Sequence, residues 1–138
     1  MARRTIKLKD YLKVVEEYPA DAAITPGTFV ALNSDGEVAA VANEESGLMV
    51  AVEDNFQGKT ISDNYAAADK VQCWIPQRGD VMYGVLASGQ NVTVGAKLAI
   101  TTGGKLTAVA TATGDTVAIA LEAVNAATAD ARIIARIV

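Results

Sequence analysis

The amino-acid sequence predicts an all-β fold, either a small closed β-barrel or a compact sandwich, built from two pseudo-repeated hairpin units behind an extended N-terminal arm. Short apolar stretches separated by turn residues run through most of the chain, which is typical of strands. The same order of strands and turns occurs twice, and the start of the chain differs from the rest in charge. We therefore divide the sequence into an arm, residues 1–17, and a β-barrel body, residues 18–138.

The first predicted hairpin covers residues 24–42. Its first strand ends at Leu32 and its second begins at Glu37, with a polar turn between them. The turn contains Asp35-Gly36, and glycine suits a tight turn because it adopts positive φ without a steric cost. The pattern predicts a strand, a turn and a returning strand.

A second hairpin, residues 92–110, aligns with the first without a gap. The identical pairs are Thr25 and Thr93, Gly27 and Gly95, Ala31 and Ala99, Gly36 and Gly104, and Ala40-Val41-Ala42 with Ala108-Val109-Ala110. After one extra residue, residues 48–53 match residues 117–122 in character, and residues 70–75 match 132–137 more weakly. We interpret the match as a duplication with pseudo-repeats of about 24–76 and 92–138, and convergence of hairpin sequences is the alternative. Two halves could close into one barrel or sandwich and so hide exposed strand edges.

The arm is basic, whereas the rest of the chain is acidic and the whole carries a formal charge of −4. Residues 5–9 alternate apolar and charged side chains like a half-buried strand, and residues 10–17 have the spacing of a short amphipathic helix that Tyr18-Pro19 would end. We predict that the arm binds an acidic partner, and an ordinary first strand of the domain is the alternative. The predicted binding residues are Arg3, Arg4, Ile6, Lys7, Leu8 and Lys9.

Two further segments are expected to lie outside the hairpins. Residues 54–69 are polar and loop-like, with a short helical turn expected over residues 65–68. Residues 125–130 are an alanine-rich linker.

The sequence argues against catalysis. It contains no histidine, so the commonest general base and metal ligand is missing. Cys73 is the single cysteine, and it cannot build a zinc site or an intrachain disulfide. The acidic pairs Glu16-Glu17, Glu44-Glu45 and Glu53-Asp54 are interpreted as solvated surface. We expect no catalytic residues, no metal and no cofactor.

Partners of two kinds are also not expected. An acidic body argues against general nucleic-acid binding, and no stretch has the roughly 20 apolar residues of a membrane helix. No apolar segment follows the basic start, so no secretory signal is predicted and the protein should be made in the cytoplasm. Arg78-Gly79-Asp80 is therefore interpreted as a turn between strands and not as an adhesive motif.

Several short stretches of the body together form a recognisable pattern. They are Pro26 to Leu32, Asp35-Gly36, the strand from Gly47 to Val52, Gly79-Asp80, Gly95 to Leu98, Gly104-Lys105-Leu106, and the Arg-flanked strand at the end of the sequence. With them, roughly residues 18–138 resemble the phage capsid decoration, or cement, proteins.

The resemblance implies a small β-barrel, commonly a homotrimer, that sits on the outside of a phage head and bridges subunits of the major capsid protein. It also implies an N-terminal arm that clasps a neighbour. The expected location is therefore the virion surface, after synthesis in the host cytoplasm. The alternative is a non-catalytic, β-rich module that binds carbohydrate or a receptor on a virion or cell surface.

Overall fold

The computed structural model describes residues 3–44, 47–109 and 115–138. It confirms the prediction of an all-β protein with a small closed barrel. The strands are β1 (Lys7–Lys9), β2 (Val15–Pro19), β3 (Phe29–Leu32), β4 (Val38–Ala40), β5 (Met49–Val52), β6 (Lys70–Trp74), β7 (Val81–Leu86), β8 (Gln90–Val92), β9 (Lys97–Thr101), β10 (Lys105–Ala108), β11 (Ala118–Ala120), β12 (Val124–Ala126) and β13 (Ala131–Ile137). One 3-10 turn, η1 (Asn55–Gln57), lies between β5 and β6. Across these ranges, no helix has the length and apolar character needed to cross a membrane.

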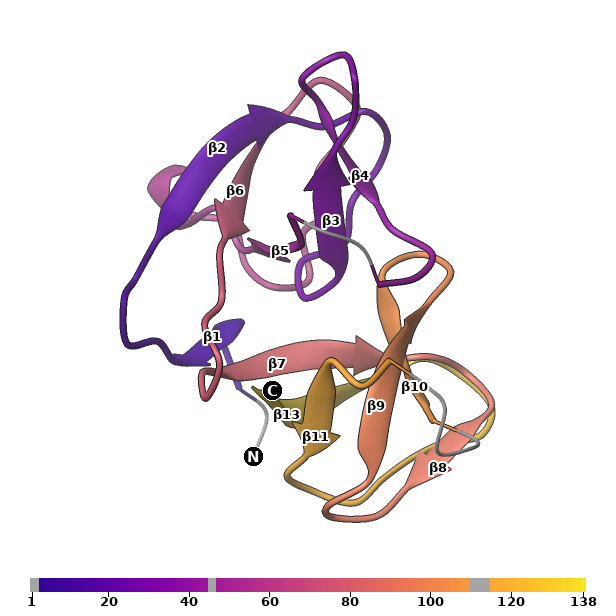
Figure 1. Ribbon diagram of the computed structural model, residues 1–138. Coiled ribbons are helices and arrows are strands. Elements are labelled where there is room, and N and C mark those ends of the chain that lie inside the picture. The colour runs from indigo at the N-terminus through magenta and orange to yellow at the C-terminus, as the bar shows by residue number, and fades with distance from the viewer. Residues whose placement is uncertain (1–2, 45–46, 110–114) are drawn as a thin grey trace.

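The second half of the chain forms a closed five-stranded barrel, which we call the second barrel (Figure 1). Its strand order is β7-β10-β9-β11-β13, and β13 pairs back with β7. The neighbours are antiparallel except at Leu106 and Leu86, where β10 runs parallel to β7. Strand β1, from the start of the chain, adds to β7 as a sixth strand.

The first half forms its own five-stranded sheet, which we call the first barrel, in the order β2-β6-β5-β3-β4. A parallel bridge between Ala20 and Val38 joins its two outer strands, and the Asp21 N–H donates to the Val38 carbonyl over 2.9 Å. The equivalent bond in the second barrel runs from the Ala87 N–H to the Leu106 carbonyl over 2.8 Å. Each half therefore closes on itself with the same strand order, whereas the sequence suggested that the two halves would close together into one barrel or sandwich.

The same hydrogen bonds also recur at the start of each hairpin. The Gly27 N–H donates to the Ala51 carbonyl over 2.7 Å, and the Gly95 N–H donates to the Ala120 carbonyl over 2.8 Å. In both halves this bond ties the turn before a hairpin to the strand that follows it. Matching residues of the ungapped alignment therefore occupy matching places in the two barrels.

Two hydrophobic cores result, and strands β3 and β5 contribute to both. Successive side chains of a strand point to opposite faces, so Phe29 and Val50 join one core while Val30 and Ala51 join the other. The core of the first barrel contains Ala20, Ile24, Val30, Val38, Met49, Ala51, Tyr65, Val71 and Cys73. The larger core contains Ile6, Phe29, Ala31, Val41, Val50, Val52, Trp74, Met82, Leu86, Val92, Leu98, Ile100, Leu106, Ala118, Ala120, Ala126, Ile133 and Ala135. The outer face of the first barrel thus packs on the second, and this apolar layer fixes the two barrels relative to each other.

The prediction of a helix over residues 10–17 is wrong. The Asp10 carboxylate accepts from the Lys13 N–H (2.8 Å) and from Trp74 Nε1 (3.3 Å), which holds this segment as a bend. Lys13 has a φ of 58°, which an α-helix does not allow. The residues that follow form β2 and pair with β6, so strand pairing with a buried neighbour prevails over the helical spacing.

Two smaller predictions also fail. Residues 65–68 form no helical turn, because Tyr65 bridges to Ile24 and Ala68 adopts a positive φ of 72°. The expected linker at residues 125–130 begins inside a strand, since β12 pairs with β8. The segment at residues 125–130 looks irregular in sequence because its side chains are small, whereas backbone pairing does not depend on large side chains.

Cys73 lies in β6 and is completely buried. Burial is the main cause that raises the pKa of its thiol to about 12, and Glu16 adds to the effect. The reactive thiolate is therefore scarce near neutral pH in the folded state, whereas an unfolded cysteine ionises near 8.5. We expect Cys73 to resist a disulfide-exchange reagent at mildly alkaline pH and to react fully in concentrated guanidinium chloride. Rapid reaction of the folded protein would contradict the burial and would reveal opening of the β2–β6 pair.

Candidate attachment surface

The N-terminal strand is anchored on this chain's own barrels. Ile6 is completely buried, its N–H donates to the Glu53 carboxylate over 3.1 Å, and its carbonyl accepts from the Tyr83 N–H over 2.8 Å. Glu53 belongs to the loop after β5, and Tyr83 belongs to β7. Ile6 therefore contacts both barrels and serves as part of their common core.

The residues after Ile6 continue along β7. Lys7 is opposite Met82 in the ladder, and the Lys7 ammonium lies 3.5 Å from the Asp10 carboxylate. Leu8 is half-buried and Lys9 is exposed. In the single chain, then, the predicted arm adds a strand to its own sheet.

The buried carboxylate of Asp80 holds the next residues in place. It accepts from the Tyr11 N–H over 3.2 Å and from the Gln77 N–H over 2.8 Å. Asp80 has no exposed surface, so the acidic group of Arg78-Gly79-Asp80 is occupied by the protein's own backbone. This placement agrees with a turn and gives the tripeptide no adhesive use.

The six predicted binding residues therefore differ in their exposure to solvent. Arg3, Arg4 and Lys9 are exposed, whereas Lys7 and Leu8 are half-buried. Ile6 is used by this chain's own core and is not available to a partner. A partner-binding role for the other five stays a prediction.

Arg3 and Arg4 line a groove of about 690 Å³, which we call the basic groove. Two cations from distant parts of the sequence, Lys59 and Arg132, line it as well. The described residues that line it are Arg3, Arg4, Thr5, Asn55, Lys59, Thr60, Ile61, Ser62, Tyr83 and Arg132. Sequence reasoning missed Lys59 and Arg132 because they come from a polar loop and from β13, and only the tertiary fold brings them to the arm.

Arg132 is the most constrained of these cations. Its Nη1 donates to the Pro26 carbonyl over 2.6 Å, and its Nη2 donates to the Ile61 carbonyl over 2.8 Å. Partial burial lowers the pKa of the guanidinium, while the nearby Tyr83 and Glu53 act in the opposite direction. An arginine keeps its proton in any case, so the groove holds a fixed positive charge.

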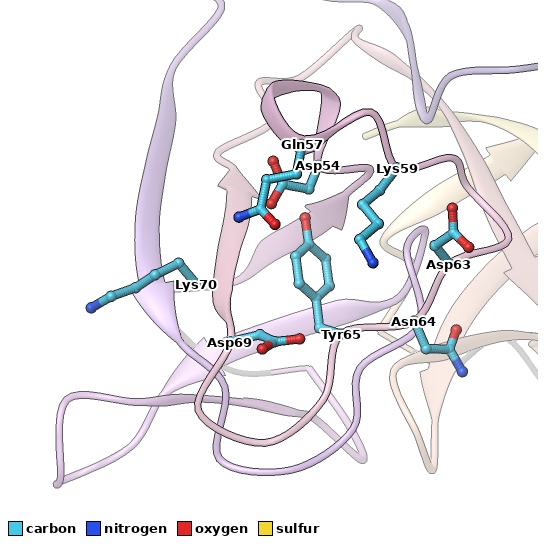
Figure 2. Close-up of a pocket in the computed structure, with 8 residues that line it drawn as sticks. All are labelled: Asp54, Gln57, Lys59, Asp63, Asn64, Tyr65, Asp69 and Lys70. Carbon is cyan, nitrogen blue, oxygen red and sulfur yellow. The ribbon is translucent and has the colours of Figure 1, made fainter.

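A second, smaller hollow of about 180 Å³ surrounds Tyr65 (Figure 2). The Tyr65 hydroxyl donates to the Val52 carbonyl over 2.5 Å, and burial raises the pKa of the phenol. The carboxylates of Asp63 and Asp69 accept from backbone N–H groups of Thr60 and Ala66, so they serve local turns. Within residues 3–44, 47–109 and 115–138, no group of three or more metal-ligating side chains could hold an ion.

The acidic pair Glu53-Asp54 is not solvated surface, and that prediction is wrong. Glu53 is 4% exposed and Asp54 is 7% exposed. Glu53 is buried because it caps the N–H of Ile6. One oxygen of Asp54 is buried with no hydrogen-bond partner in the part of the chain that the structure describes. The position of Glu53 and Asp54 side by side in the sequence does not reveal that the loop after β5 folds against the N-terminal segment at Ile6.

No family model matches the chain, and no curated protein sequence matches it. Among solved structures, the chain is similar to the head fiber gp8.5 N base of bacteriophage phi29. The two share 13% sequence identity with a TM-score of 0.61, and the match covers 92% of this chain and 95% of that chain. The likeness therefore concerns the fold, and it extends over nearly the whole length of both chains.

Proposed function

We propose that this protein is a non-catalytic structural component of a phage head, which binds the outer surface of the shell and cements neighbouring subunits of the major capsid protein. The observation that carries the proposal is the fold shared with a head fiber base along nearly the whole chain. The resemblance of residues 18–138 to decoration proteins agrees with it. Both point to a protein that acts by binding and needs no turnover.

The physical demands of this role suit a rigid body with several weak contacts. Identical contacts on a symmetric shell reinforce one another, because each bound site raises the effective concentration of the next.

We propose that the protein acts as a homotrimer. The apolar side chains of Tyr11, Leu12 and Phe56 are 70%, 64% and 89% exposed, and contacts between copies or with the shell would cover them.

The proposal is tested by sedimentation with heads of the phage that encodes the chain, prepared without this protein. We expect saturable binding with a fixed number of copies per head, and we expect the decorated heads to survive heating better than bare ones. The unlabelled protein should displace a labelled sample. Binding that does not saturate, or no binding at all, would overturn the proposal.

The solution mass is measured on the same sample by light scattering. We expect a trimer, three times the 14.3 kDa chain. A monomer in solution that becomes a trimer only on heads would keep the attachment role and would place assembly on the shell.

A further inference from the structure

We propose that the basic groove binds an extended acidic peptide, whose carboxylates contact Arg3, Arg4, Lys59 and Arg132. This inference rests on the proposed function, in which the peptide belongs to a protein subunit of the shell. It goes further in naming the groove and the chemistry of its ligand.

The charges in the groove differ sharply from those of the protein as a whole. The chain has a formal charge of −4, yet the described residues that line the groove include four cations and no carboxylate. Among the described residues, the ion pairs are Lys7 with Asp10 and Lys105 with Asp130, and neither pair uses a cation of the groove. Glu53 lies near Arg132 and Asp63 lies near Lys59, and these carboxylates, which are not part of the lining, offset some of the repulsion among the four cations. An anionic ligand in the groove would relieve the rest.

Arg132 gives the groove a fixed point of attachment. Its two bonds to carbonyl groups orient the guanidinium without neutralising it. A guanidinium has five N–H donors, so donors remain for a carboxylate, and bonds between charged partners are roughly twice as strong as neutral ones. A half-buried cation that is already held in place loses little entropy when a ligand binds.

The remaining lining fits a polypeptide. Thr5, Asn55 and Ser62 can exchange hydrogen bonds with a peptide backbone, and Ile61 and Tyr83 offer apolar contact to its side chains. The groove is far larger than the 180 Å³ hollow at Tyr65, and it has room for several residues of extended chain. A nucleic acid would need a longer basic stripe than the four cations of this groove provide.

The test measures binding of a fluorescent peptide of about ten residues, rich in Asp and Glu, by anisotropy at low salt. The test variant carries Arg4→Glu and Lys59→Glu, and both residues are exposed, so the fold should persist. We expect its affinity to fall at least about tenfold, which corresponds to the loss of one or two charge-assisted bonds. A matching peptide of Asn and Gln should not bind the wild-type protein.

The control variant carries Arg78→Glu and Lys97→Glu, which make the same change in charge at exposed residues outside the groove. We expect its affinity to stay within about twofold of the wild type, because separated surface charges are screened by salt. An equal loss of affinity in both variants would overturn the proposal, since it would show that the peptide is attracted by the overall charge and not by the groove. Tighter binding of single-stranded DNA than of the acidic peptide would overturn it too, as would blockage of the groove by a second copy of the chain.

The two variants are then sedimented with heads. If the groove variant binds heads as well as the wild type does, the inference fails while the proposed function stands. If no version binds heads but peptide binding follows the expected pattern, the proposed function fails and the ligand chemistry of the groove stands. Loss of head binding in the groove variant alone would support both.

Discussion

Replacing Gly104 by alanine is expected to destabilise the protein by about 3–5 kcal/mol, a loss near the top of the range for one added methyl group. Gly104 has a φ of +70°, and a Cβ there would lie 2.2 Å from the carbonyl oxygen of Phe29 and 2.8 Å from its nitrogen. The Phe29 N–H donates to the Gly104 carbonyl over 2.8 Å, and the Gly104 N–H donates to the Val41 carbonyl over 2.7 Å. These bonds hold the hairpin of the second barrel against the hairpin of the first, so a side chain at this position would separate them.

The duplicated fold provides a matched control for this prediction. Gly36 occupies the equivalent place in the first hairpin and has a φ of +76°, but an added Cβ there meets nothing within 4 Å. Gly36→Ala should therefore cost only the backbone penalty of about 1–2 kcal/mol. Equilibrium unfolding in urea, followed by the fluorescence of the buried Trp74, measures both. Equal losses in the two variants would show that the contact between hairpins contributes nothing.

Ile6→Ala is expected to cost about 2–5 kcal/mol, the usual range for removing a large apolar side chain from a core. Ile6 has no exposed surface and belongs to the larger core, where it contacts both barrels. The substitution leaves a cavity in the layer between the barrels while keeping its backbone bonds to Glu53 and Tyr83. The free energy of unfolding, again from urea, should fall accordingly.

Leu8→Ala serves as the control, because Leu8 lies two residues further along the chain, in β1, and is only half-buried. We expect it to lose about 1 kcal/mol or less. If the two substitutions had equal effects, the N-terminal strand would be held by its backbone alone. An unchanged stability for Ile6→Ala would show that the strand is not packed between the barrels in solution.

This anchoring changes how an attachment role must be tested. A truncation that begins at Tyr18 would remove Ile6, all of β1 and part of β2, so it would damage the fold as well as any binding surface. Loss of head binding in that truncation would therefore not distinguish a damaged fold from a missing binding surface. Substitutions at Arg3 and Arg4 alter the charge of the exposed segment and leave the buried contacts in place, which makes them the better probes.

The sequence predicted the hairpins well because their physical cause is local. The turn at residues 33–36 requires positive φ at one position, and glycine stands there. The turn at residues 101–104 has positive φ at two positions, and both of them, Gly103 and Gly104, are glycines. Alternation of apolar residues defined the neighbouring strands, and the ungapped match placed corresponding strands in corresponding order.

The rest could not be predicted because its causes are not local. Residues 10–17 have helical spacing, but β6 was available as a pairing partner and the Asp10 side chain bound Trp74. The burial of Glu53 depends on a backbone N–H 47 positions away. The basic groove combines two residues of the arm with Lys59 and Arg132, and no pattern in the sequence connects these positions.

The pairing of the first and last strands has a mechanical consequence. Lys7 in β1 and Ala135 in β13 are both partners of Met82 in β7, so the two ends of the described chain lie on either side of one strand of the second barrel (Figure 1). The whole first barrel is formed between β1 and β7 in the sequence. A force that pulls the two ends apart would therefore load β1, β7 and β13 first, together with the contact between Ile6 and Glu53. The chain from β2 to β6 would not be stretched from end to end until β1 had detached. A partner held by the first barrel would be shielded from strain transmitted through the chain ends.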